Sequence, residues 1–180
     1  MLSIKVPDWD EWDEKTESFV AHKGPKLKLE HSLISISKWE AVTHKAYFNS
    51  EKTDAEVLFY ISCMTVGSEP TIEELSHLGV KELDIIGNYI KDIHTATTFR
   101  EEPGSRSPSK KKITSEEIYY WMISAGIPFE CEKWHIERLL TLIRVVNEKN
   151  KPKKKIPRKA ALAQQAKLNA QRRARLGTTG

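Results

Sequence analysis

The chain has 180 residues, a length that suits one domain with appendages and allows a buried core. It has no run of eighteen apolar residues and only two cysteines, so neither a transmembrane helix nor a disulfide framework is expected. The net charge of +4 hides an asymmetry, because eleven of the 29 Lys and Arg and none of the 25 Asp and Glu lie in residues 149–180. An acidic body therefore carries a basic tail, a pattern typical of an interaction arm.

Residues 1–24 form an acidic segment that has Trp9 and Trp12 among its carboxylates. An acidic start does not fit a signal peptide, so secretion is not expected. The composition favours a brief edge strand at Ile4 and Val6 followed by a solvated, poorly ordered segment. The alternative is a docking peptide that anchors its two tryptophans on a partner or on the chain's own basic tail.

Residues 25–148 are predicted to form the core domain of a mainly α protein. Leu27, Leu29 and His31 alternate with polar residues and predict a short strand that pairs with residues 4–6. Helices are then indicated by four Ser/Thr-x-x-Glu capping boxes, each of which precedes apolar residues at helical spacing. The boxes begin at Ser37, Thr53, Thr71 and Thr114.

A predicted helix and a predicted loop precede residues 114–146 in this domain. Leu83, Ile86, Ile90 and Ile93 recur at the spacing of an amphipathic helix. Residues 101–112 contain Pro, Gly, Ser and Lys without an apolar side chain, which predicts an exposed loop.

Residues 114–146 are predicted to form an αα-hairpin at the centre of the domain. The first helix should end at Gly126 and Pro128, and the second should begin at about Glu130. A short connection favours antiparallel neighbours. The predicted core residues of the hairpin are Ile118, Trp121, Met122, Trp134, Ile136, Leu139, Leu140 and Ile143.

Residues 149–180 are predicted to form a basic C-terminal arm, flexible or marginally helical. A proline-broken linker leads into residues 158–176, which are rich in helix formers but have a thin apolar stripe. The arm has no aromatic residue for base stacking, which favours a protein partner over nucleic acid. The residues expected to contact the partner are Lys153, Lys154, Lys155, Arg158, Lys159, Arg172, Arg173 and Arg175.

No enzyme is predicted, and no cofactor. The chain lacks a P-loop, a Gly-x-Gly-x-x-Gly motif, a His-Glu-x-x-His motif and a Cys-x-x-Cys pair. Cys131 and His135 share a helical face and could supply half a metal site, completed by His44 or Cys63 from afar. Zinc sites usually show more closely paired ligands, so ordinary packing is the favoured interpretation and no metal is predicted.

Three long blocks of the sequence resemble a family of small proteins of long-tailed bacteriophages. The blocks are HSLISISKWEAVTHKAYF (residues 31–48), IYYWMISAGIPFECEKWHIERLLTLIRVVNEKN (residues 118–150) and LNAQRRARLGTTG (residues 168–180). The family is associated with the position between the major tail protein and the tape measure protein, where tail assembly chaperones are encoded.

The resemblance implies a tail assembly chaperone that acts in the host cytoplasm. Such a protein binds the helical tape measure protein, keeps it soluble and helps to recruit tail tube subunits, including the major tail protein. A homo-oligomer is compatible with this role, and no membrane is involved. Two alternatives are a phage nucleic-acid-binding or host-directed protein acting through the basic tail, and a minor structural protein of the virion.

Overall fold

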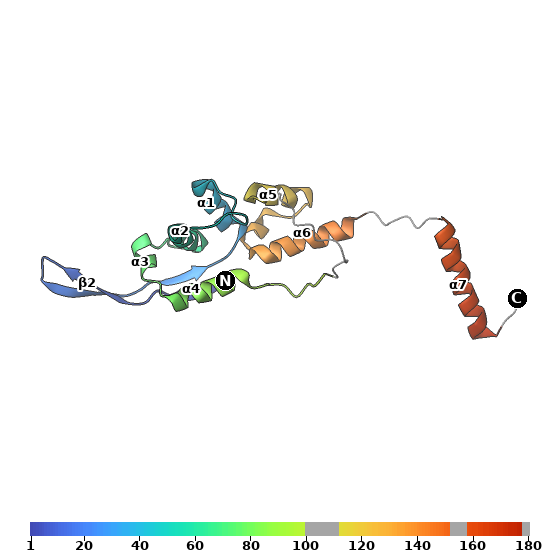
Figure 1. Ribbon diagram of the computed structural model, residues 1–180, viewed down its shortest axis with the longest axis horizontal. Coiled ribbons are helices and arrows are strands. Elements are labelled where there is room, and N and C mark those ends of the chain that lie inside the picture. The colour runs from blue at the N-terminus through green and yellow to red at the C-terminus, as the bar shows by residue number, and fades with distance from the viewer. Residues whose placement is uncertain (100–111, 152–157, 178–180) are drawn as a thin grey trace. The chain divides into compact units, whose positions relative to one another are not determined.

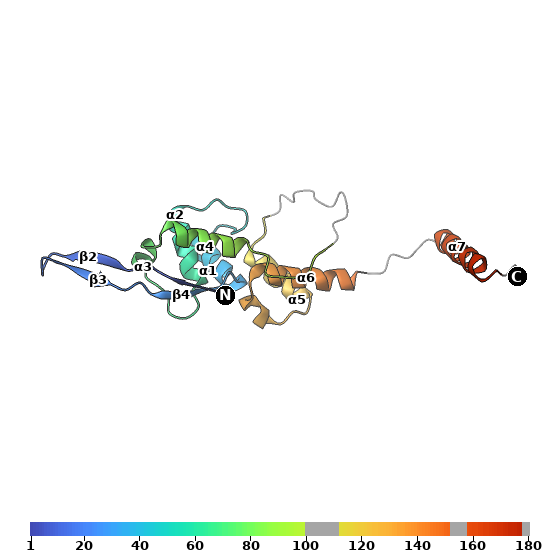
Figure 2. The same ribbon diagram turned by 90° about the horizontal axis from the view of Figure 1, so that it is seen from below.

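The computed structural model describes residues 1–99, 112–151 and 158–177 (Figures 1 and 2). Almost all of the predicted loop 101–112 lies outside the described residues. The chain divides into two compact units, residues 1–147 and residues 148–180.

The described residues are mainly helical, with short strands confined to the first 29 residues. The elements are β1 (Leu2–Lys5), β2 (Trp9–Asp13), β3 (Ser18–His22), β4 (Lys26–Leu29), α1 (Leu33–Thr43), α2 (Asp54–Met64), α3 (Ile72–Ser76), α4 (Val80–Lys91), α5 (Ser115–Ser124), the 3₁₀ helix η1 (Phe129–Lys133), α6 (Ile136–Asn150) and α7 (Arg158–Leu176).

The predicted strand pair is confirmed. β1 and β4 are antiparallel, with Ile4 opposite Leu27, and both side chains are buried in the core. The other edge of β4 is covered by the chain that leaves α2, because the Val66 amide donates to the Lys28 carbonyl at 2.7 Å. The Glu30 amide likewise donates to the Met64 carbonyl at 2.9 Å. β4 therefore fixes the end of α2 beside the start of α1.

The acidic segment is a β-hairpin, not the poorly ordered stretch that its composition indicates. β2 pairs with β3 in antiparallel register, with Trp12 opposite Phe19. Their rings meet edge to face, with centroids 5.0 Å apart. The turn is held by Asp13, which accepts hydrogen bonds from the Lys15 amide and the Thr16 hydroxyl, both at 2.9 Å. Local side-chain hydrogen bonds and a cross-strand aromatic pair thus compensate for low apolar content.

Gly24 closes the base of this hairpin. Its amide donates to Asp8 Oδ1 at 2.9 Å, and a Cβ at this position would come within 1.9 Å of the Val6 carbonyl oxygen. Any side chain here would force the two chain segments apart.

Two of the four predicted capping boxes are confirmed, at Thr53 and Thr71. The box at Ser37 is wrong, because α1 begins earlier and its N-cap is Ser32, which forms a capping box with Ser35. Thr114 does precede α5 as its N-cap, but its side chain makes no capping hydrogen bond. The predicted amphipathic helix is α4, in which Ile86 is buried, whereas Ile93 lies beyond its end and is exposed.

The αα-hairpin of residues 114–146 is not confirmed. α5 packs mainly against α1, and η1 occupies the region where the second helix was expected to begin. The start of α6 is instead tied to the β4–α1 connection, because the Ile136 amide donates to the His31 carbonyl at 2.8 Å. This long-range bond, together with the 3₁₀ turn after Pro128, sets the direction of α6.

The core of the first unit gathers side chains from the β1–β4 pair, from helices α1 to α6 and from η1. Five of the eight core residues predicted for the hairpin are buried: Ile118, Met122, Ile136, Leu139 and Ile143. Trp121, Trp134 and Leu140 are partly buried and pack against this core. Trp39, which lies outside the predicted αα-hairpin, is among the largest fully buried side chains.

Candidate functional site

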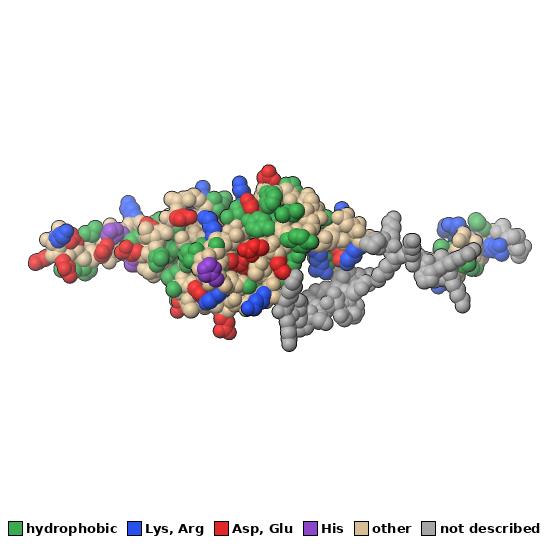
Figure 3. Space-filling model, turned by 90° about the horizontal axis from the view of Figure 1, so that it is seen from above, with side chains coloured by type: hydrophobic (Ala, Val, Ile, Leu, Met, Phe, Trp, Pro, Cys, Tyr) green, Lys and Arg blue, Asp and Glu red, His purple; other side chains and the backbone are tan. Residues whose placement is uncertain are grey.

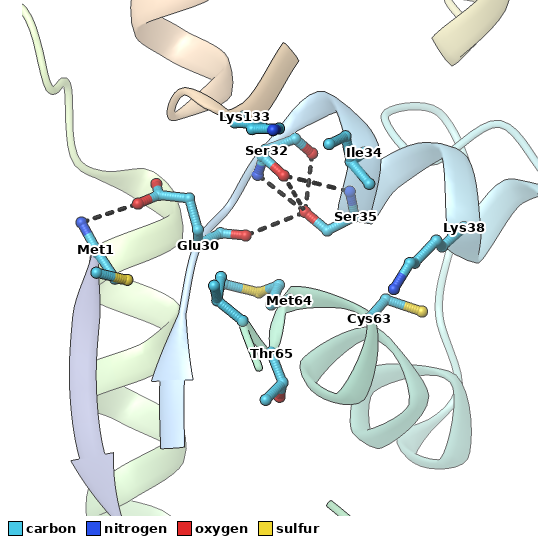
Figure 4. Close-up of a pocket in the computed structure, with 11 residues that line it drawn as sticks. Met1, Glu30, Ser32, Ile34, Ser35, Lys38, Cys63, Met64, Thr65 and Lys133 are labelled. Atoms are coloured by element: carbon cyan, nitrogen blue, oxygen red, sulfur yellow. Dashed lines mark hydrogen bonds and ion pairs between the residues drawn. The ribbon is translucent and has the colours of Figure 1, made fainter. Parts of the chain in front are cut away.

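A pocket of about 500 Å³ opens where α1 begins and α2 ends. Figure 4 shows Met64 and Thr65 at the end of α2, Ile34 and Lys38 on α1, and Lys133 from η1. The residues that line it are Met1, Glu30, Ser32, Ile34, Ser35, Lys38, Cys63, Met64, Thr65, Val66 and Lys133. It is called the α1–α2 pocket below.

Hydrogen bonds fix the polar part of the wall. The Ser35 hydroxyl donates to the Ser32 carbonyl at 2.8 Å, while the Ser32 amide donates to Ser35 Oγ at 2.9 Å. These bonds belong to the α1 capping box, so both serines are already used in holding the helix start. The remaining wall is largely aliphatic, formed by Ile34, Met64 and Val66. The pocket is therefore preformed and suited to apolar groups.

Charged groups lie at the rim of the pocket. Lys38 Nζ is 3.3 Å from Glu69 Oε1 in an exposed ion pair, and the Met1 amino group is 2.9 Å from Glu30 Oε2 (Figure 4 shows the second pair). Lys133 is exposed and makes no ion pair with another described residue. Among the described residues of the rim, Lys133 therefore presents an ammonium group that is not already in an ion pair.

Cys63 lies beside Lys38 in this wall (Figure 4). Partial burial raises the pKa of its thiol to about 11. At pH 7, far below this pKa, the sulfur is a neutral thiol. A cysteine acts as a nucleophile only as the thiolate, so this thiol is unreactive. It contributes apolar surface to the pocket and not a nucleophile.

Glu30 connects the pocket to a cluster of histidine and tyrosine rings in which His31 and His135 are buried. The Tyr89 hydroxyl donates to Glu30 Oε1 at 2.7 Å, and the Tyr89 carbonyl lies 3.2 Å from His135 Nε2. His135 packs against the rings of His31 and His94, with centroids 5.1 Å and 4.1 Å away. This cluster joins α4, the β4–α1 connection and the start of α6, and so holds the elements around the pocket.

The sequence allowed Cys131 and His135 as half a metal site but favoured ordinary packing for both. Both are buried in the core region, and within the described residues no group of three or more His, Cys, Asp or Glu side chains is placed to hold a metal ion.

A second surface exposes large apolar side chains on α5 and η1. Tyr120 and Ile123 point outward from α5, Phe129 from η1, and all three are more than half exposed. Tyr119, partly buried, lies beside Phe129 with ring centroids 6.2 Å apart. Figure 3 shows several such hydrophobic clusters on one face of the body, which is a feature of surfaces that bind other proteins.

The second compact unit contains helix α7. Arg172, Arg173 and Arg175 are exposed on it, and Arg158 and Lys159 belong to its first turn. Lys153, Lys154 and Lys155 lie outside the described residues. No helix that the structure describes is long and apolar enough to cross a membrane.

Sequence patterns did not indicate the α1–α2 pocket. Lys38 lies on α1, Cys63 on α2 and Val66 in the connection after α2. They meet only in the folded chain, where α1 packs on α2 and the Val66 amide bonds to β4. Comparisons with protein families, with curated proteins and with solved structures find no match to this chain.

Proposed function

We propose that the protein is a tail assembly chaperone of a long-tailed bacteriophage and binds helical segments of the tape measure protein in the host cytoplasm. The observation that carries this proposal is the α1–α2 pocket, a preformed apolar cavity on a helical body with lysines at its rim. The phage assignment rests on the three sequence blocks that resemble the chaperone family.

The volume of the pocket suits side chains presented by a helix. Pockets of roughly 300–1,000 Å³ can enclose a small molecule, so a cavity of about 500 Å³ has room for more than one aliphatic side chain. An amphipathic helix presents such side chains together, at positions i, i+3, i+4 and i+7. A long helical protein offers many segments of this kind, so one pocket can engage it at successive places.

The rim charges favour helices that carry acidic residues beside their apolar face. Lys38 and Lys133 would meet carboxylates while the aliphatic wall covers the apolar anchors. Exposed ion pairs add little affinity, but they set orientation and increase the association rate. The basic arm extends the same charge preference beyond the pocket.

The arm and the pocket have separable roles in this proposal. Reversing Arg172, Arg173 and Arg175 to Glu should slow association with an acidic partner and reduce its salt dependence, while changing dissociation little. A pocket variant should instead increase the dissociation rate, because the loss of apolar contacts changes mainly the rate at which a complex dissociates.

Binding of purified tape measure segments to pocket variants tests the proposal. Val66→Asp places a carboxylate in the apolar wall, and because Val66 is 52% exposed the fold should tolerate it. The dissociation constant, measured by calorimetry, should rise at least tenfold, which corresponds to about 1.4 kcal/mol.

Val42→Asp is the matched control, since Val42 is 64% exposed on α1 and does not line the pocket. It should change the dissociation constant less than twofold. Equal losses in both variants would show that the pocket is not the binding site.

Nucleic-acid binding is the second candidate, because α7 carries six Lys and Arg and no Asp or Glu between residues 158 and 176. A DNA affinity that falls steeply with salt and disappears when residues 149–180 are deleted would favour it. Stoichiometric presence in purified virions would instead favour a structural role.

A further inference from the structure

The β2–β3 hairpin is an acidic ribbon whose two faces differ. Between Asp8 and His22 there are six Asp and Glu and one Lys. By strand alternation, Trp12 and Phe19 lie on one face, and Glu11 and Asp13 on the other with Val20. In Figure 3 acidic side chains line this projecting part of the molecule.

Both faces of the hairpin expose groups that a partner would cover. Trp12, Phe19 and Val20 are 51%, 70% and 42% exposed. On the carboxylate face a second, open hollow of about 300 Å³ is bordered by Glu11, Asp13 and Val20. A two-stranded ribbon with solvent on both sides is only marginally stable by itself, so a contact that covers its aromatic pair would stabilise it.

The base of the hairpin is held firmly, which presents the ribbon in one orientation. Trp9 stacks between His22 of β3 and His77 at the end of α3, with ring centroids 5.3 Å and 4.3 Å away. Asp8 adds the hydrogen bond to the Gly24 amide described above. The exposed aromatic pair therefore belongs to an anchored element and not to a loose chain end.

Helix α7 has the complementary chemistry. Its described part exposes Lys167, Arg172, Arg173 and Arg175 together with three leucines, at positions 162, 168 and 176. Leu168, Arg172 and Leu176 recur every four residues, so apolar and cationic side chains share one face of the helix. Such a helix is marginal alone in water and becomes ordered on a partner.

We propose that the acidic hairpin binds the basic helix α7 of a second copy of this chain. Charge complementarity selects this occupant, since six carboxylates meet a helix with six cations and no carboxylate. Arginine side chains can stack on Trp12 or Phe19 while their guanidinium groups reach neighbouring carboxylates. The inference does not rest on the proposed function.

The arrangement within the first unit favours a second copy over the chain's own helix. The hairpin projects from one end of this unit, whereas α6, which leads toward the arm, runs out at the opposite end (Figures 1 and 2). Six residues lie between Lys151 and Arg158, so these two residues can be at most about 25 Å apart when the linker is fully extended. Copies joined hairpin to helix would form open chains or closed rings.

The test measures the mass of the full-length protein by sedimentation velocity across a concentration series, at low and high salt. The wild-type protein should self-associate at low salt and dissociate at high salt, because exposed charges are screened. Asp10→Lys/Glu11→Lys/Glu14→Lys alters exposed hairpin carboxylates but spares Asp8 and Asp13, which hold the hairpin ends. It should weaken association at least tenfold.

The reciprocal variant, Arg172→Glu/Arg173→Glu/Arg175→Glu, should weaken association equally. Mixing the two variants should restore it, because a lysine hairpin then meets a glutamate helix. A matched control, Glu51→Lys/Asp84→Lys/Glu130→Lys, makes the same charge change at exposed positions outside the hairpin and should leave association close to that of the wild-type protein.

A protein that stays monomeric at every concentration and at low salt overturns the proposal. So does association that persists in both charge-reversal variants, or that the mixture fails to restore.

Discussion

Glu40 shows how one buried carboxylate can connect three parts of a fold. Its Oε1 accepts the Tyr47 amide at 2.8 Å and its Oε2 accepts the Ser115 amide at 2.7 Å. It thereby joins α1 to the following loop and to the first turn of α5. The sequence pattern assigns Glu40 to a capping box with Ser37, but its partners lie 7 and 75 residues away.

Glu40→Gln should destabilise the first unit by about 1–3 kcal/mol, because an amide NH₂ would face one of the two backbone N–H groups and leave it unsatisfied. Glu51→Gln, at an exposed position nearby in sequence, is the control and should change stability by less than about 0.5 kcal/mol. Chemical denaturation measures both. Equal effects would show that the Glu40 carboxylate does not carry these bonds.

His31 is a buried histidine that the fold keeps neutral. Its pKa is lowered from the ordinary 6.5 to about 3, first by burial and then by the positive charges of His135, Lys52 and His94, in that order. Its Nδ1 is hydrogen-bonded to the Tyr60 hydroxyl. The pKa of His135 is also lowered, first by burial and then by His94. The hydrogen bond to the Tyr89 carbonyl and the charge of Glu30 raise it, but by less.

Stability should therefore fall on acidification. The unfolded chain binds a proton at His31 near pH 6.5 and the folded chain only near pH 3, so the stabilisation is complete above pH 6.5 and is lost as the pH falls through this window. The loss approaches about 1.4 kcal/mol per pH unit for each such group. Melting curves of His31→Gln should show a shallower acid dependence, whereas the exposed His44→Asn should retain the wild-type slope.

At the scale of elements, three helix starts with the same Thr-x-x-Glu pattern behave differently. Thr53 and Thr71 accept from the amides of Glu56 and Glu74, and these glutamates accept the threonine amides in return. Thr114 makes no such side-chain bond. The local pattern predicts the capping box correctly at Thr53 and Thr71, where the capping side chains are exposed. At α5 the Ser115 amide is bound by Glu40, a contact that the local pattern does not contain.

Thr53→Ala and Thr71→Ala should each cost about 0.5–2 kcal/mol, the usual loss for a removed N-cap. Thr114→Ala should cost clearly less, because no capping bond is removed. Urea denaturation of the three variants measures the difference. A loss at Thr114 as large as at Thr53 would contradict the arrangement described for α5.

The elements also show where sequence patterns stop being sufficient. Alternation at Leu27 and Leu29 predicted the β1–β4 pair. One face of each strand is buried, and side chains on that face recur at every second residue, so the sequence shows the pattern. The β2–β3 hairpin was missed, since its apolar side chains are exposed and its turn depends on Asp13. The α1–α2 pocket depends on Val66 joining β4, a contact between distant segments that leaves no periodic signal.

At the scale of the whole molecule, the two units should be energetically independent. The core lies entirely within residues 1–147, and α7 adds no buried side chain among its described residues. Deleting residues 151–180 keeps α6 complete and should change the melting temperature of the first unit by no more than about 2 °C. A larger decrease, seen by circular dichroism, would mean that the arm contributes to folding of the body.

In the proposed function, this protein keeps a helical tape measure protein soluble through the α1–α2 pocket. The most direct measurement is the soluble fraction of tape measure protein co-expressed with the wild-type chain, with Val66→Asp, with Val42→Asp, or alone. The wild-type chain and Val42→Asp should keep it soluble, and Val66→Asp should leave it largely insoluble, as without a chaperone. Tape measure protein that is equally soluble in all four cultures would contradict the claim.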